Sequence, residues 1–226
     1  MKTGNSTCRV KNKKFEFLPF AFCLLPVALF LSGCTVFYVG GEIVTGRQEL
    51  LYGDPKVALA HFQRAGELDP DYLTNFTILR QGVWTYVGRA NYALGNLVDA
   101  RRALERARSR SGEDNLARLY LGLVLARDGD RQRGVGEIEG GLRGLSQWFD
   151  YIEQYHADGQ FWDPGRPIRS EIQKSIAMLS AREVNWNELI ASGEWLGREL
   201  EQEIDRARKD QQDEDKLYRD GDGRGD

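Results

Sequence analysis

Cysteine is absent from this chain after position 34. The 226 residues include three cysteines, Cys8, Cys23 and Cys34. Residues 35–226 therefore contain no thiol, which excludes a disulfide framework and a thiolate metal site from most of the chain. The exclusion holds even though the N-terminus, discussed below, predicts an exported protein.

Histidine is also scarce, and motifs that carry catalysis are missing. The two histidines are His61 and His156, and the only nearby metal-ligand type is Asp158, two residues after His156. No Ser-His-Asp pattern, nucleophile elbow or phosphate-binding loop is present. Paired carboxylates such as Glu137/Glu139 and Glu201/Glu203 are typical of solvated helix faces. We therefore expect no enzyme activity, no cofactor and no metal.

An excess of positive charge is missing as well. The formal net charge is -3, with 31 basic and 34 acidic residues. The basic residues of the first 33 positions give that segment a positive charge, so the rest of the chain is more acidic than the total suggests. A mildly acidic body lacks the electrostatic footprint of a nucleic-acid-binding protein.

A helical repeat is the strongest pattern that the chain does contain. Trp84–Ala107 predicts two short helices joined by a turn at Gly95, and its second helix places Ala100, Leu104 and Ala107 on one face. The pattern returns 34 residues later. This shift maps Gly88 to Gly122, Gly95 to Gly129, Ala100 to Gly134, Leu104 to Ile138 and Ala107 to Gly141. A period of this length built from a helix, a turn and a helix indicates stacked repeats.

Residues 58–70 carry the resemblance of this repeat to a known family. Ala58, Phe62, Ala65 and Pro70, with Gly53 as a turn glycine, stand at the offsets of the second helix of a tetratricopeptide repeat (TPR). The resemblance implies an all-α fold, a short α-solenoid of TPR hairpins. Repeats are expected at about 39–72, 81–114 and 115–148, within a repeat region 41–146. The eight extra residues before the second repeat fall in 69–76 and predict an extended linker or a lengthened helix.

The third repeat is rich in glycine. Gly134 and Gly141 replace both alanines of its second helix, and Gly136, Gly140 and Gly144 add three more glycines. Each glycine costs about 0.8–1 kcal/mol against alanine in a helix interior. The helix is therefore either packed unusually close to its neighbour or locally unstable, and we favour close packing.

Beyond Leu145 the period is lost, and residues 147–213 predict a helical extension. One helix is expected at 147–155, a loop at 159–167, a helix from Pro167 to about 181, and a long helix from Trp186 to about 213. Residues 167–206 suit the polar terminal cap that repeat arrays need. The composition of residues 214–226 predicts a disordered tail.

The N-terminus predicts export and lipid attachment. A basic segment precedes an apolar run, which ends in Leu31, Ser32, Gly33 and Cys34. These four residues resemble the bacterial lipobox. The resemblance implies that residues 1–33 are a signal peptide, that Cys34 carries the lipid, and that 34–40 form a linker. Acyl chains on one residue anchor a protein firmly, because each buried methylene contributes about 0.8 kcal/mol. In enterobacterial lipoproteins, an aspartate directly after the lipidated cysteine marks retention in the inner membrane. Position 35 is threonine, so the outer membrane facing the periplasm is the expected location.

An uncleaved membrane span is the alternative for the N-terminus. Residues 17–39 are almost wholly apolar, close to the roughly 20 residues that a span needs. Pro19, Pro26 and Gly33 weaken this alternative.

The TPR resemblance also implies a concave groove, lined mainly by first-helix positions, that binds a partner. Its expected residues are Arg47, Arg89, Tyr92, Asn96, Leu119, Leu123 and Arg127. The groove lacks the lysine and asparagine pattern with which some TPR proteins clamp a C-terminal carboxylate. Arginines here either grip carboxylate or phosphate, or merely solubilise a helix face and pair with nearby acids.

Two functions remain open from the sequence. The first is a membrane-anchored periplasmic scaffold or adaptor that binds a protein or peptide through the groove. The second is a small-molecule-binding lipoprotein that serves a transporter or an envelope export system. A run of aromatic residues fits either a core seam under the C-terminal helices or a ligand-facing patch. This run comprises Trp148, Phe149, Tyr151, Tyr155, Phe161 and Trp162.

Overall fold

All regular structure in the described part of the chain is helical. The computed structural model describes residues 38–74 and 79–222. Within these ranges the only β-type pairing is an isolated antiparallel bridge between Leu73 and Gly82. The predicted all-α class is therefore confirmed for the described residues.

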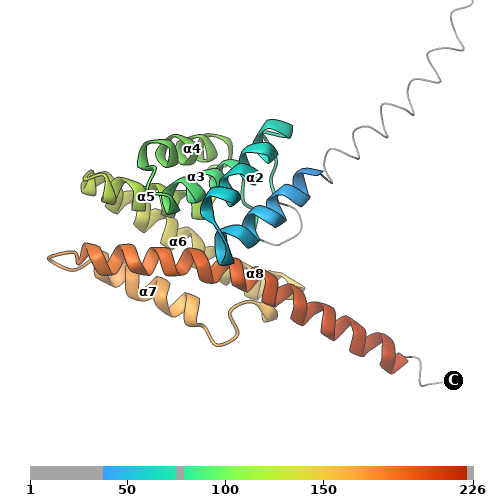
Figure 1. Ribbon diagram of the computed structural model, residues 1–226. Coiled ribbons are helices and arrows are strands. Elements are labelled where there is room, and N and C mark those ends of the chain that lie inside the picture. Colours follow the sequence, from blue (N-terminus) through green and yellow to red (C-terminus); the bar gives the residue numbers. More distant parts are fainter. Residues whose placement is uncertain (1–37, 75–78, 223–226) are drawn as a thin grey trace, which may run out of the picture. The chain divides into compact units, whose positions relative to one another are not determined.

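The N-terminal helices pack one on the next along the chain (Figure 1). A first helix covers residues 38–52. It is followed by α2 (Pro55–Leu68), α3 (Val83–Ala93), α4 (Leu97–Arg110), α5 (Asn115–Arg127) and α6 (Arg131–Tyr155). The helices α2 to α6 each contact the next one, and α3 also contacts α5.

Local sequence explains where these helices begin. The Asp54 side chain accepts a hydrogen bond from the backbone N–H of Lys56 at 2.8 Å, and Pro55 occupies the first turn of α2. Such a cap satisfies one of the free N–H groups of a helix start. Gly95 and Gly129 adopt positive φ angles of 78° and 95° in the turns before α4 and α6. Glycine adopts this left-handed conformation without steric cost.

The linker before α3 is extended where the structure describes it. The helix α2 ends at Leu68, and Thr74 donates a backbone hydrogen bond to the carbonyl of Gln81 at 3.0 Å. Residues 75–78 lie outside the described part. Of the two predictions for this segment, the extended linker is the one that the described residues follow.

Glycine lets α6 pack very closely on α5. A Cβ at Gly141 would lie 2.6 Å from the backbone nitrogen of Leu119, and one at Gly134 would lie 3.1 Å from that of Ala126. The two helices therefore touch backbone to backbone at these positions, which confirms the prediction of close packing. Gly136 has no neighbour within 4 Å of such a Cβ, so close approach explains only some of the glycines.

The C-terminal segment differs from the prediction in two helix boundaries. The helix predicted at 147–155 is not separate, because α6 continues unbroken to Tyr155. A 3-10 helix η1 (Ala157–Phe161), α7 (Pro167–Leu179) and α8 (Trp186–Asp222) follow. The expected end near 213 and the disordered tail are wrong for residues 214–222. Glu214, Lys216, Leu217 and Arg219 in this stretch are good helix formers, and Lys216 pairs with Asp213 at 3.0 Å one turn away.

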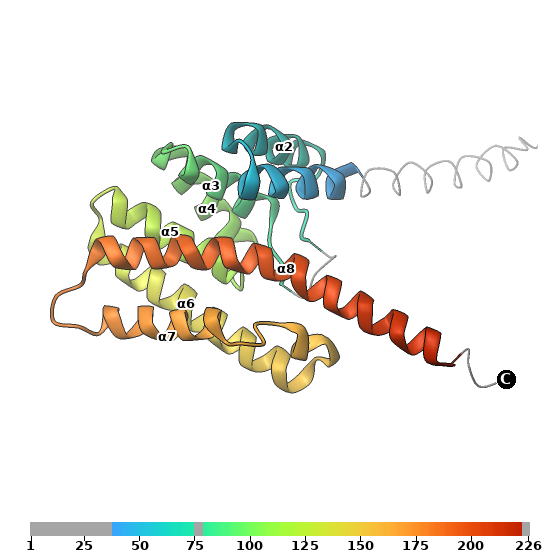
Figure 2. The same ribbon diagram turned by 60° about the horizontal axis from the view of Figure 1, so that its bottom comes forward.

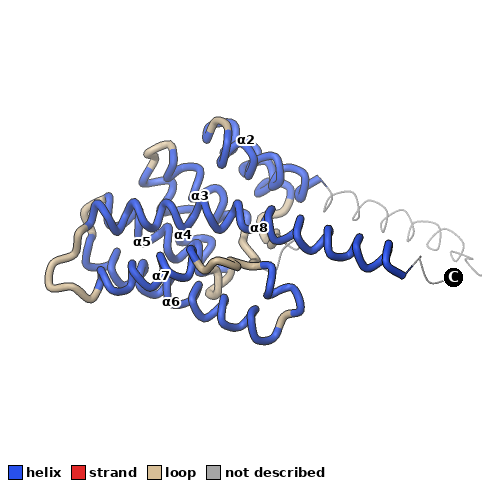
Figure 3. Tube along the Cα trace, turned by 90° about the horizontal axis from the view of Figure 1, so that it is seen from below, coloured by secondary structure: helices blue, strands red, loops and turns tan. Residues whose placement is uncertain are grey.

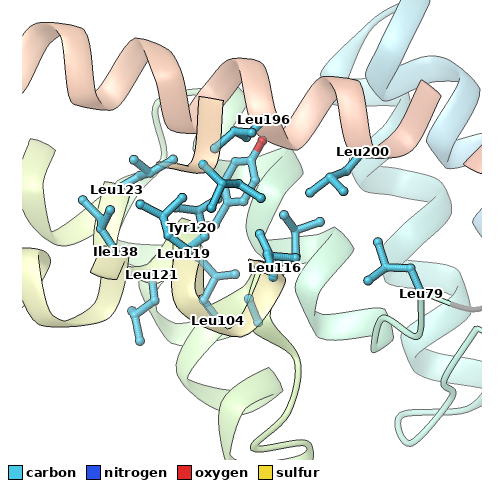
Figure 4. Close-up of a cluster of buried hydrophobic side chains, with 14 of the residues drawn as sticks. Leu79, Leu104, Leu116, Leu119, Tyr120, Leu121, Leu123, Ile138, Leu196 and Leu200 are labelled. Carbon is cyan, nitrogen blue, oxygen red and sulfur yellow. The ribbon is translucent and has the colours of Figure 1, made fainter. Parts of the chain in front are cut away.

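The helix α8 lies against the helix that precedes it and against elements that are more distant in sequence. It contacts α5, α7 and η1, while α7 also packs on α6. Figures 2 and 3 show α8 beside α7, with its C-terminal part extending past α7. Leu196 and Leu200 of α8 meet Leu116, Leu119 and Leu123 of α5 in the larger core cluster (Figure 4). The helix α8 therefore contributes side chains to the core and also shields it from solvent.

Candidate functional site

The predicted groove is covered by the chain's own C-terminal helix. Glu201 of α8 pairs with Arg47 of the first helix and with Arg89 of α3. Nearer the start of α8, Glu194 accepts a hydrogen bond from the Tyr92 hydroxyl at 2.7 Å. The face of the first helix and α3 that was expected to meet a partner therefore meets α8 instead.

Small residues allow α8 to approach this face closely. A Cβ at Gly193 would lie 2.8 Å from Leu123 Cδ2, and a Cβ at Gly197 would overlap the ring of Tyr120. Gly193, Gly197 and Glu201 are spaced by four, so they lie on one face of α8. This face turns towards α3 and α5.

A buried ion-pair network joins α8 to the first helix. The Arg47 Nε donates to Glu201 Oε2 at 2.5 Å, and its Nη2 donates to the Glu201 carbonyl at 3.0 Å. The same guanidinium reaches Asp205 Oδ1 at 3.3 Å. Arg47 and Glu201 are 2% and 1% exposed, so this pair is shielded from water.

The same carboxylate holds α3. Arg89 donates through Nη1 to Glu201, and through Nη2 to the Gly197 carbonyl at 3.0 Å. The Gln81 amide donates to Glu201 Oε1 at 3.0 Å and accepts from Arg89 Nη1 at 3.2 Å. Every charged member thus has several partners, as a buried ionic group requires.

The electrostatics of Glu201 follow from these partners. Burial by itself would raise the pKa of its carboxyl, but the Arg89 and Arg47 guanidinium groups outweigh burial and hold the pKa below 4.5. Burial would lower the pKa of the Arg89 guanidinium, yet Glu201 raises it above its ordinary value. Both groups are therefore charged when they are buried.

The expectation of an open groove is wrong for five of the seven predicted residues. Arg47, Arg89 and Tyr92 are almost completely buried in contact with α8, although Arg89 and Tyr92 also border a cleft beside it. Leu119 and Leu123 lie in the core. The physical reason is that α8 supplies both the apolar side chains and the carboxylates that these residues need. For Arg47 and Arg89, the alternative reading of pairing with acidic residues describes their contacts.

The other two predicted groove residues are exposed. Asn96 precedes α4, and its amide lies 3.4 Å from the Asn91 side-chain oxygen. The Arg127 guanidinium lies 4.9 Å from the centre of the Tyr92 ring and 3.6 Å from Glu194. The structure thus brings Arg127, but not Asn96, to Tyr92.

The sequence interpretation missed the acidic members of the network. Glu201 and Glu203 were expected on a solvated face, but both are buried, and Glu203 accepts the backbone N–H of Asp163 and pairs with Arg206. The spacing of Gly193, Gly197 and Glu201 was the available signal, because a glycine row marks a face that packs closely.

A cleft remains open where α8 leaves the groove face uncovered. We name it the arginine cleft; its volume is about 280 Å³. Its walls come from the first helix, α3, α5 and α8. They comprise Leu50, Leu51, Arg89, Tyr92, Ala93, Tyr120, Arg127, Glu194 and Arg198.

A second hollow adjoins the arginine cleft. We name it the Trp186 hollow, of about 460 Å³, and it shares Arg127 and Glu194 with the cleft. Its remaining walls are Ala126, Arg131, Trp186, Asn187, Ile190 and Ala191. The two together follow the N-terminal part of α8 along its contact with α5.

The aromatic run divides between core and surface. Phe149 and Trp162 are buried, and Trp148 makes edge contacts with both, at ring-centre distances of 4.9 and 5.0 Å. Phe161 packs against the same cluster. Tyr151 and Tyr155 are exposed, so the core seam accounts for four of the six side chains.

The remaining site predictions concern metals and the N-terminus. Within residues 38–74 and 79–222, no three metal-ligating side chains gather at one place. None of the helices in these ranges combines the length and hydropathy that a membrane span needs. Leu31, Ser32, Gly33 and Cys34 lie outside the described residues.

Comparison of the chain with protein-family models, with curated proteins and with solved structures gave no match.

Proposed function

We propose that this protein is a lipid-anchored periplasmic scaffold or adaptor, built as a short TPR-like α-solenoid, which binds a protein or peptide in the arginine cleft. The observation that carries the proposal is the origin of the cleft walls. Leu50, Leu51, Arg89, Tyr92, Ala93 and Arg127 are all positions that repeat register places on a groove face. The cleft is thus the part of that face which α8 leaves available.

Equivalent contacts support the repeat architecture. Gly88 of α3 lies against Leu104 of α4, and Gly122 of α5 lies against Ile138 of α6 in the same way. These pairs are the ones that the 34-residue shift maps onto each other. Gly46 lies against Phe62 of α2 at the same sequence separation. Three helix pairs are therefore joined by one recurring contact between glycine and a large apolar side chain.

The anchor and location rest on the lipobox residues. Leu31, Ser32, Gly33 and Cys34 support attachment to the bacterial cell envelope, and Thr35 supports the outer membrane. A helical body tethered beside a membrane would present the arginine cleft to periplasmic partners.

Site-specific photocrosslinking tests the scaffold function. A photoreactive amino acid replaces Ala93, an exposed residue of the cleft wall, and in a matched variant it replaces Val98, which is 70% exposed on α4. We expect one discrete adduct from position 93 in living cells and none from position 98. Equal adducts from both positions, or none from position 93, would contradict binding in the cleft.

Small-molecule binding is the second candidate, and the size of the cleft favours it. A volume of about 280 Å³ is close to the lower end of ligand pockets, roughly 300–1,000 Å³, and Tyr92 and Tyr120 supply aromatic walls. A metabolite screen by thermal shift separates the candidates. A ligand that raises the unfolding temperature of the wild type, but not that of Tyr92→Ala, would favour this function over the scaffold.

A further inference from the structure

The charges around the two hollows do not cancel. Glu194 is shared by the Tyr92 hydroxyl and the Arg127 guanidinium, so the one acid of the arginine cleft already has its partners. Arg89 is neutralised by Glu201. Arg198 lines the cleft, is exposed, and has no acidic partner among the described residues. The cleft therefore carries one uncompensated positive charge.

The Trp186 hollow carries a second uncompensated charge. Arg131 lies 5.3 Å over the Trp186 ring and, within the described ranges, pairs with no carboxylate. It is the first residue of α6, where the helix dipole disfavours a cation. Helix stability therefore does not explain an arginine here, whereas an anionic ligand beside it would offset the unfavourable charge.

The surfaces between these charges are apolar and aromatic. Leu50, Leu51 and Tyr120 line the arginine cleft, and Trp186 and Ile190 line the hollow. A ligand that fits both must combine apolar groups with acceptors for separated guanidinium groups. An extended peptide does so, because its side chains follow one another along a backbone that advances about 3.3 Å per residue.

We infer that the two hollows together bind an acidic peptide segment, with carboxylates that pair with Arg198 and Arg131 and apolar or aromatic side chains seated between them. Guanidinium and carboxylate groups form paired, charge-assisted hydrogen bonds. A nucleic acid is the less suitable polyanion, because the whole chain carries a net charge of -3 and the uncompensated arginines are few. This inference rests on the proposed function, since it names the class of peptide that the scaffold would bind.

Peptide display on the purified full-length protein, held in detergent micelles, tests the inference with a defined probe. The selection uses random dodecapeptides on the wild type and on the double variant Arg131→Glu/Arg198→Glu. The matched control is Arg143→Glu, a side chain 57% exposed on α6 and distant in sequence from both hollows. Unchanged thermal unfolding of each variant shows that the body folds and that the arginines are not needed for folding.

We expect the wild type and Arg143→Glu to enrich peptides rich in Asp and Glu beside aromatic residues. The double variant should bind the enriched peptides at least about tenfold more weakly, a difference of about 1.4 kcal/mol. The same peptides should weaken steeply with added salt, because the pairs are exposed.

Other outcomes separate the inference from the proposed function. Peptides that are enriched without acidic residues, and that are lost on Tyr92→Ala, would overturn the acidic class while the scaffold function stands. If no peptide is enriched on the wild type, both the inference and peptide binding in the cleft are contradicted.

Discussion

Arg89 and Glu201 form an ion pair across 112 positions of sequence, and both side chains are almost completely buried. The pair connects α3 to α8 in the middle of the surface that repeat register marks as a groove. Because a buried charge is stable only with its partners in place, this pair fixes the position of α8 relative to α3.

Removal of the Glu201 charge should strongly destabilise the fold. Glu201→Gln leaves Arg89 buried without a counter-charge and leaves Arg47 paired with Asp205, and breaking a buried pair in this way costs about 3–5 kcal/mol. Urea unfolding followed by circular dichroism measures the loss. Glu139→Gln removes an exposed carboxylate from α6 and should leave the midpoint nearly unchanged. Equal midpoints for both variants would contradict a structural role for the network.

Acid should reduce the difference in unfolding free energy between the wild type and Glu201→Gln. The pKa of Glu201 is lower in the folded protein than its ordinary value of 4.5. A depressed pKa contributes stability above the unfolded-state value, and this stability is lost as the pH falls through the folded-state value. The difference in unfolding free energy should therefore be full near pH 7 and shrink below about 4.5.

Comparing the wild type with Glu201→Gln also removes the contribution of Asp114 to the pH dependence. Burial raises the pKa of the Asp114 carboxyl despite its hydrogen bonds from Thr85, Ala117 and Gly82, so Asp114 acts in the opposite direction. Both proteins contain Asp114, and its effect cancels in the difference. A difference that is constant from pH 7 to pH 3 would contradict the assignment to Glu201.

Two glycines of α6 should respond oppositely to alanine. At Gly141 a methyl group would meet the backbone of α5 at 2.6 Å, so Gly141→Ala should cost about 1–3 kcal/mol. Gly136 faces open space, and Gly136→Ala should gain about 0.8–1 kcal/mol from helix propensity. Thermal unfolding of both variants checks the signs, and stabilisation by both would show that α5 and α6 are not in backbone contact.

Two buried tyrosines should likewise differ when the hydroxyl is removed. The Tyr86 hydroxyl is buried without a hydrogen-bond partner, so Tyr86→Phe should stabilise the protein by about 1 kcal/mol. The Tyr92 hydroxyl donates to Glu194, so Tyr92→Phe should cost about 1–2 kcal/mol. Unfolding midpoints of the two variants should fall on opposite sides of the wild type. Destabilisation by Tyr86→Phe would reveal an acceptor for that hydroxyl.

Lipid attachment should depend on one thiol. Metabolic labelling with a fatty-acid analogue should mark the wild type, and Cys34→Ala should abolish the label, because the lipobox resemblance implies attachment through the Cys34 sulfur. Cys23→Ala, within the apolar run, is the control and should keep the label. A label that persists on Cys34→Ala would contradict the lipobox.

Much of the local structure was predictable from short-range pattern. The helix start at Pro55 follows from Asp54, and the turns at Gly95 and Gly129 follow from the conformational freedom of glycine. The close approach of α6 to α5 was visible in the glycines at 134 and 141. The continuation of α6 beyond 148 was not, because the loss of the repeat pattern resembles the end of a helix.

The sequence by itself determined most of the helices, their order and the inward face of the helices between residues 55 and 145, because these depend on neighbours within one or two turns. Only the tertiary structure decided what covers that inward face. Glu201 has the sequence context of a solvated carboxylate, and it becomes the centre of a buried network because α8 folds back onto residues more than one hundred positions earlier. Burial of a charge depends on which surfaces meet in the folded protein. The sequence pattern of α8 alone does not indicate that Glu201 pairs with Arg47 and Arg89.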